Sequence, residues 1–538
     1  HDEHRERITE LLEPVYREQD WWQKLVVILD AKLEYIQDPP TQVQTLHEIA
    51  EIHEERGGAI DLALAALARA WRIDVSDDAA LTKLLSLAGK LDAWNEAVLT
   101  VEEGAANAPN GDLAAGLWAR AAEIHEVQRN DLPRAIDAWR KVDESRPDDL
   151  VALAALDRLL AIEGRVPELV KVIERRADLT EDAGVRLVLL HRVAALYEEV
   201  LEDKPNAITA YKNVLGVDDT DLAALDALER LYRDTDNARE MAVTLERKID
   251  LTTEVELRQQ LRHSAAQVYE HHLEDVYRAI EHYTAILDDD PSDAAALAEL
   301  DRIYGKQKMW PELLDVLDKR ALLATDARDR ADLAYRAAHL VETEMSDPDA
   351  AIPRYGAVLG VLPSHEAARA SLEVLMAHDD HAVAVSPLLE RVYKADRDAP
   401  GLIRVYERRL ALADRDPADR RADWEALADV RESIAGQPAQ AFVVWGRALA
   451  DTPDDAELLA PLLRLAESQN LWRDLAALLD ERFAESADQL PPDVEQTYAM
   501  RLGQIAEDRL SDLERAAKAY DRASHGPETR PALAALER

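Results

Sequence analysis

Residues 187–219 read LVLLHRVAALYEEVLEDKPNAITAYKNVLGVDD, and the pattern of this stretch decides the fold. From Leu190 onward, its first half has apolar residues at the i, i+3, i+4 and i+7 positions that line one face of an amphipathic helix. Asp203 stands where an N-cap residue accepts free amide hydrogens, and Pro205 lies in the first helical turn, where its missing N–H costs nothing. The stretch therefore predicts two helices joined as a hairpin.

The hairpin belongs to an internal repeat, because Leu84 and Leu156 are 156 − 84 = 72 residues apart and other residues recur at the same spacing. We call residues related in this way a column. The clearest columns are Leu12, Leu84, Leu156, Leu228, Leu300 and Leu372; Ala50, Ala122, Ala194, Ala266 and Ala338; Glu54, Glu126, Glu198, Glu270 and Glu342; and Ala63, Ala135, Ala207, Ala279 and Ala351. Four apolar-periodic segments fill each period, so the period predicts two helical hairpins.

The period is interrupted once. Ala351 and Ala441 are 441 − 351 = 90 residues apart, which indicates that about one helix has been inserted. We expect a regular array over residues 1–372, an irregular segment with the inserted helix over residues 373–419, and a resumed array over residues 420–538. Neither end has a polar capping repeat, so we expect a fragment of a longer chain or ends that are buried in an assembly.

The first hairpin of each unit resembles tetratricopeptide repeats, most closely in Ala279-Tyr283-Ile286-Pro291 and Ala351-Tyr355-Val358-Pro363. The second hairpin departs from that motif, since its tryptophan opens the fourth helix. The acidic, alanine- and arginine-rich chain is also similar to large tetratricopeptide proteins of myxobacteria and related bacteria. The resemblance implies an all-α fold, a right-handed α-α superhelix of helical hairpins with a four-helix superrepeat, and it implies no settled activity.

Composition excludes several classes of function. Lys and Arg number 64 against 108 Asp and Glu, so the net charge is −44, and such a chain is repelled by nucleic acid. Without cysteine there is no thiolate metal site, and neither GxGxxG nor GxxxxGK[ST] occurs. Because no apolar run is long enough to span a bilayer, we expect no membrane insertion. We expect a cytoplasmic protein, with a periplasmic or envelope-associated location left open.

Histidines are the first candidates for chemistry. His47, His191 and His263 share a column that Tyr335 continues, but a whole four-helix unit separates successive members. The segment from His378 to His381 could hold a metal ion or be a solvated turn, and the second interpretation is favoured. We therefore predict no catalytic residue, no cofactor and no metal, and we expect that the chain is not an enzyme.

The glutamate column has two interpretations, both left open by the sequence. Its members could present a row of carboxylates to a basic ligand, or each could pair with an arginine of a neighbouring helix. We predict a non-enzymatic scaffold that binds protein partners, including basic segments, on an acidic superhelical surface. The alternative is a self-assembling structural protein that forms filaments, tubes or an envelope assembly through its uncapped ends. The predicted partner-binding residues are His191, His263, Tyr335, Glu126, Glu198, Glu270 and Glu342.

Overall fold

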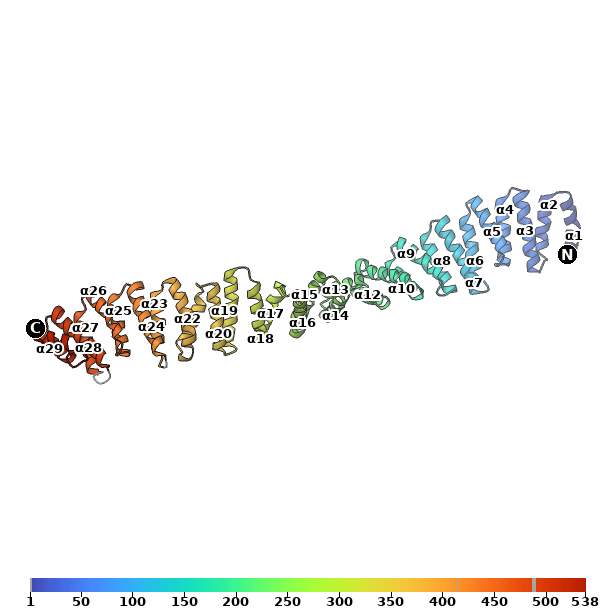
Figure 1. Ribbon diagram of the computed structural model, residues 1–538. Helices are drawn as coiled ribbons and strands as arrows, with labels where there is room; N and C mark the ends of the chain where they lie inside the picture. The colour runs from blue at the N-terminus through green and yellow to red at the C-terminus, as the bar shows by residue number, and fades with distance from the viewer. Residues whose placement is uncertain (1, 414, 486–489) are drawn as a thin grey trace. The chain divides into compact units, whose positions relative to one another are not determined.

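The computed structural model describes residues 2–413, 415–485 and 490–538. Over these ranges, thirty α-helices follow one another and no strand occurs (Figure 1). Consecutive helices contact one another and are joined by short turns, which is the arrangement of an array of helical hairpins. The predicted all-α helical-repeat fold is confirmed.

Packing divides the chain into two compact units, residues 1–275 and 276–538, and each is described here by itself. The helices of the first unit are α1 (Asp2–Glu18), α2 (Trp22–Leu33), α3 (Pro39–Glu55), α4 (Ile60–Ile73), α5 (Asp78–Leu91), α6 (Trp94–Ala106), α7 (Gly111–Glu123), α8 (Leu132–Ser145), α9 (Leu150–Glu163), α10 (Val166–Leu179), α11 (Ala183–Ala195), α12 (Lys204–Val217), α13 (Leu222–Asp234), α14 (Ala238–Leu251) and α15 (Val255–His271). The predicted boundaries at residues 372 and 419 follow the repeat rather than this packing, and they stay a prediction.

The helices of the second unit are α16 (Val276–Asp289), α17 (Ala294–Gln307), α18 (Trp310–Leu323), α19 (Ala327–Thr343), α20 (Pro348–Val361), α21 (Glu366–Met376), α22 (Asp379–Asp396), α23 (Ala399–Leu410), α24 (Pro417–Asp429), α25 (Pro438–Asp451), α26 (Leu459–Gln469), α27 (Trp472–Glu485), α28 (Pro492–Ile505), α29 (Leu513–Ala523) and α30 (Thr529–Glu537). Four first helices end in a π-helical turn, namely η1 (Ile124–Gln128) after α7, η2 (Leu196–Val200) after α11, η3 (Val430–Ile434) after α24 and η5 (Ala506–Leu510) after α28. Glu126 and Glu198 of the glutamate column lie in these turns, and so does Glu432, which follows Glu342 at the interrupted spacing of 432 − 342 = 90 residues.

Helix starts follow the aspartates that the sequence singles out. The Asp203 carboxylate accepts the backbone N–H of Asn206 and caps α12, with a proline in the first turn. Asp131, Asp347 and Asp512 cap α8, α20 and α29 in the same way. These caps fix where the second helix of a hairpin begins, because they satisfy amide hydrogens that have no partner inside the helix.

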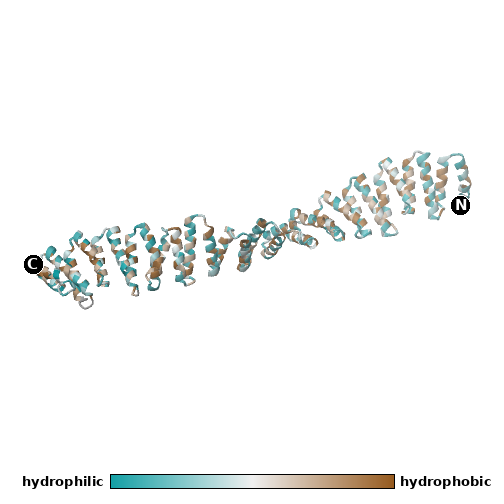
Figure 2. Cartoon of the chain, viewed as in Figure 1, coloured by the Kyte–Doolittle hydropathy of each residue, from teal (hydrophilic) through white to brown (hydrophobic). Residues whose placement is uncertain are grey.

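The alanine columns are buried where neighbouring helices pack. Every alanine from Ala50 to Ala338 in the first column, and from Ala63 to Ala351 in the second, is fully buried. A larger side chain there would force neighbouring helices apart, since protein interiors are close-packed. Leucines such as Leu156 fill the space beside them. Hydrophobic positions are accordingly spread along the helices of both units rather than gathered in one block (Figure 2).

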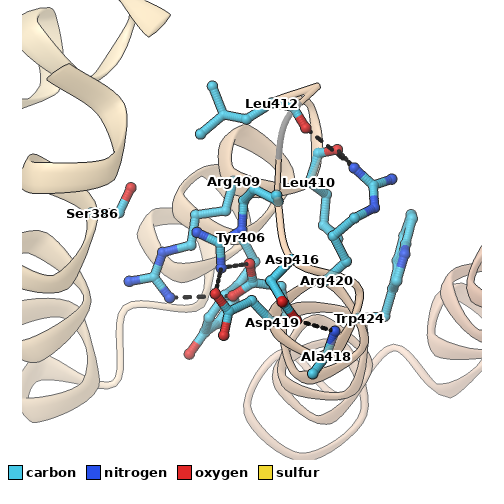
Figure 3. A network of polar contacts seen from close by, with 12 residues as sticks. Ser386, Tyr406, Arg409, Leu410, Leu412, Asp416, Ala418, Asp419, Arg420 and Trp424 are labelled. Carbon is cyan, nitrogen blue, oxygen red and sulfur yellow. Dashed lines mark hydrogen bonds and ion pairs between the residues drawn. The ribbon is translucent and has the colours of Figure 1, made fainter. Parts of the chain in front are cut away.

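The irregular segment contains one helix more than the regular pattern. Two helices, α17 and α18, separate the hairpin α15–α16 from the next first helix α19, whereas three helices, α21, α22 and α23, separate α20 from α24. A polar network holds the junction between α23 and α24 (Figure 3). There, Arg420 donates to the carbonyl oxygens of Leu410 and Leu412, at 3.2 Å each.

Charged side chains at this junction are buried with their partners. Arg409 donates to Asp423 at 3.2 Å and also pairs with Glu390, while Arg415 lies 2.8 Å from the second oxygen of Asp423. Tyr406 donates to Glu390 at 2.8 Å. Burial holds the pKa of the Asp423 carboxyl above its ordinary value, although Arg415 and Arg409 favour its charged form. The arginines are therefore required to keep this carboxylate inside the unit.

We expect Arg409→Met to lower the free energy of unfolding of residues 276–538 by about 3 kcal/mol, because it removes a partner from the buried Asp423 and from the partly buried Glu390. Urea unfolding followed by circular dichroism measures the loss. Arg391→Met is the matched control, since Arg391 lies exposed on α22. Equal unfolding midpoints for the two variants would contradict the assignment of Arg409 as a buried partner.

Candidate functional site

Several members of the glutamate column form ion pairs between helices. Glu126 and Arg158 form a bidentate pair, with one N–O distance of 2.8 Å. Arg230 donates to Glu198 at 2.6 Å, and Tyr211 donates to the other oxygen of Glu198 at 2.9 Å. The interhelical pairing that the sequence left open therefore describes these glutamates, because their carboxylates already hold a cation.

The same pairing recurs elsewhere in both units. The pairs are Glu54 with Lys83 and Lys90, Glu432 with Arg464, and Glu507 with Arg538. The Lys90 and Arg464 hydrogen bonds lower the pKa values of Glu54 and Glu432 respectively. The basic partners are half exposed, so each pair contributes little to stability, about 0.2–1 kcal/mol. Glu270 lies on α15, and its role as a partner-binding residue stays a prediction.

Histidines of the predicted site join first helices to the N-terminus of a third helix. His191 Nε2 lies 2.7 Å from Asp221, whose other oxygen accepts the Ala224 N–H and caps α13. His47 makes the same contact with Asp77, the cap of α5, at 2.6 Å. The His191 side chain is therefore engaged in the fold, and His263 occupies the equivalent place on α15. Within the described ranges, no three histidine or carboxylate side chains converge as a metal ion would require.

Several positions in α5–α9 hold apolar residues, although the equivalent positions of the other 72-residue repeats are polar. In three repeats an acid of the third helix pairs with a base of the fourth helix, namely Asp157–Arg176, Glu229–Lys248 and Asp301–Arg320. In the repeat that contains α5 and α6, Leu85 takes the place of the acid and Gly104 takes the place of the base. Ala119 replaces the column histidine, and Trp139 stands where Tyr211 stands. Position 127 is valine, while its column otherwise holds Glu55, Glu199, His271 and Thr343.

A groove of about 710 Å³ lies between α5, α6, α7, η1, α8 and α9. Trp94, Trp139 and Leu85 line it, and Val127 and Val151 stand on its surface with 70% and 68% of each residue exposed. Its charged lining residues are Arg120, Arg158, Glu123 and Glu126, so the charges sum to 2 − 2 = 0. The groove thus combines apolar side chains with paired charges that cancel, on a chain whose net charge is −44.

A second departure from the repeat lies on α19–α21, where two predicted site residues meet. The Tyr335 ring stacks on His339 at 5.7 Å and lies 5.1 Å from His365. His365 caps α21 by accepting the Ala368 N–H at its Nδ1 atom, so its Nε2 carries the proton that is donated to Asp332. The column has aspartate caps at Asp77 and Asp221, and Tyr335 takes the place of their histidine partners. Glu342, one turn beyond His339, belongs to the same face.

No family model matches the chain, and no curated protein matches it. A structure of Naa15/Naa10 bound to HypK-THB is 13% identical over 99% of this chain and 96% of that chain, with a TM-score of 0.27. A tetratricopeptide protein from Parabacteroides merdae is 11% identical over 48% of this chain and 96% of that chain, with a TM-score of 0.21.

YrrB, a tetratricopeptide protein with an unusual peptide-binding site, is 16% identical over 34% of this chain and 91% of that chain, with a TM-score of 0.21. Tetratricopeptide proteins recur among the matched structures. At these TM-scores the matches carry no argument about function. None of the helices in the described ranges is both long and apolar enough to cross a bilayer.

Proposed function

We propose that the chain is a non-enzymatic scaffold that holds protein partners, and that the groove on α6–α9 is a docking surface. The proposal depends on the exposure of Val127. This residue is exposed beside a second exposed valine, in a column whose other members are polar. Single exposed apolar side chains are common on protein surfaces, whereas a contiguous group of them, such as Val127 and Val151 on one groove, marks an interaction surface.

The charge of the groove favours one kind of occupant. Two arginines and two glutamates cancel there, and Glu126 is already paired with Arg158. A strongly basic segment would gain no electrostatic advantage from this lining, whereas aliphatic side chains would cover Val127, Val151 and Trp94. We infer that the occupant is an uncharged segment of a partner protein that carries aliphatic side chains.

We expect Val127→Glu to lower the affinity for such a partner by tenfold or more, since burying a valine-sized side chain contributes roughly 1.5–3 kcal/mol. The fold tolerates the change, because glutamate already occupies the column at Glu55 and Glu199. Peptides displayed on phage are selected on the wild-type chain and counter-selected on the Val127→Glu variant. The enriched peptides should be aliphatic and without net charge.

Val185→Glu, on another exposed apolar residue of the first unit, is the control and should leave the selected peptides bound. Peptides that bind the wild-type chain and the Val127→Glu variant equally well would contradict the docking surface. So would a selection that enriches only basic peptides, because the lining offers them no net negative charge.

A further inference from the structure

Glu342 differs from the other paired members of its column, because no lysine or arginine faces it in the part of the chain that the structure describes. In other units the cation comes from the third helix or its end: Lys83 and Lys90 reach Glu54, Arg158 reaches Glu126, and Arg230 reaches Glu198. These bases follow their glutamate by 83 − 54 = 29, 158 − 126 = 32 and 90 − 54 = 36 residues. The equivalent residues after Glu342 are Ser371, Val374 and His378.

The Glu342 carboxylate is nevertheless held as it is in a paired unit. Tyr355, which is fully buried, donates to it in the way that Tyr211 donates to Glu198. The exposed fractions of the two glutamate side chains are also close, at 20% for Glu342 and 17% for Glu198. A fixed and partly desolvated carboxylate interacts more strongly with a cation than one on an open surface does.

The His339 ring lies beside Glu342, and a short, exposed side chain stands where the other repeats have a base. Val374, at the place from which Arg230 reaches Glu198, is 61% exposed. His339 Nδ1 lies 3.8 Å from Glu342, and the His339 ring is parallel to Tyr335, with an interplanar angle of 7°. A planar guanidinium can stack on such a ring and also bind a carboxylate through two N–H groups, which a lysine ammonium cannot do.

We propose that Glu342 and the face of the His339 ring bind the guanidinium of an arginine in a basic segment of a partner protein. The other repeats of this chain provide the template, since an arginine of the third helix reaches Glu126 and Glu198 and two lysines of the third helix reach Glu54. The net charge of −44 attracts such a segment from a distance. The inference rests on the proposed scaffold function but concerns a separate surface, on α19–α21 rather than on α6–α9.

A blocked pentapeptide with one arginine between alanines tests the site, with the neutral isostere citrulline in the matched peptide. Ligand-observed saturation-transfer NMR measures binding of both peptides to the full chain. The arginine peptide should bind, and Glu342→Gln should weaken it about tenfold, as expected for a charged hydrogen bond. Val374→Arg should weaken it as much, because the new side chain fills the site from within, and this variant should also melt at a higher temperature than wild type.

Two variants separate this site from general attraction to an acidic surface. Val374→Gln adds a side chain of intermediate length without charge, and Glu198→Gln removes a glutamate that is already paired. Both should bind the arginine peptide as wild type does. Equal binding to all four variants, or equal binding of the citrulline peptide, would overturn the inference. The phage selection on Val127 reads the other surface, so either proposal can fail while the other stands.

Discussion

Replacing Trp71 with alanine is expected to lower the free energy of unfolding of residues 1–275 by about 3–5 kcal/mol. Trp71 lies at the end of α4 and is 0% exposed, in a cluster with Leu81, Val98 and Leu117. Removing so large a buried side chain leaves a cavity that the surrounding helices close only in part. Urea unfolding followed by circular dichroism measures the loss, and Trp21→Ala is the control because Trp21 is exposed.

A substitution at Gly104 tests the position of the Trp71 ring directly. A Cβ atom at Gly104 would overlap the six-membered ring of Trp71, so Gly104→Ala should destabilise the wild-type chain by about 1–3 kcal/mol. In a Trp71→Leu background the ring is gone. The same substitution should then stabilise the helix by up to about 1 kcal/mol, because alanine is a better helix former than glycine. An effect of Gly104→Ala that has the same sign in both backgrounds would show that Trp71 does not occupy the space above Gly104.

The helical circular dichroism signal is expected to fall steeply between pH 10 and pH 12. Burial, and then hydrogen bonding to a glutamate, raises the pKa values of Tyr211, Tyr393, Tyr406 and Tyr520 to about 12. Above pH 10 the unfolded tyrosines lose protons that the folded ones keep, so stability is full below pH 10 and is lost as the pH rises towards 12. Each of these tyrosines can contribute about 2 kcal/mol to the loss.

Tyrosine-to-phenylalanine variants assign the alkaline transition. Tyr211→Phe should make the fall with pH shallower, because phenylalanine does not ionise, whereas Tyr277→Phe on an exposed position should leave it unchanged. Absorbance titration of tyrosine ionisation follows the same samples. If the Tyr211→Phe and wild-type curves coincide from pH 10 to pH 12, the buried tyrosines are not the cause.

Much of the fold follows from short-range patterns in the sequence. Asp203 as a cap and the fully buried alanines are local or periodic features, so spacing alone predicts them. The spacing of residues determines the pairing of Glu198 less well than it determines the caps, since Arg230 lies 230 − 198 = 32 residues away, on another helix. The sequence could offer that pairing only as one of two interpretations, because the distance between two helices depends on how they pack.

The groove on α6–α9 and the surface beside Glu342 could not be predicted from such patterns, for a related reason. Val127 and Val374 are apolar residues in helices, and a pattern alone gives no sign that they stay exposed. The signal was nevertheless present in the columns, where position 127 is otherwise polar and where the base expected 32 residues after Glu342 is missing. Reading the exceptions to a column, rather than its members, would have found both places.

The extra helix among α21, α22 and α23 reverses the direction in which each later helix of the second unit runs, relative to its counterpart before the insertion. Each short connection turns the chain back on itself, so α24, the first helix of its hairpin, runs opposite to α19. The acidic turn at Asp290–Asp293 precedes the third helix α17, and its counterpart at Asp454 and Asp455 precedes α26. These turns consequently lie on opposite edges of the array. A ligand that follows one edge would therefore meet turns that precede third helices up to the insertion, and beyond it turns that precede second helices, such as the turn at Asp512.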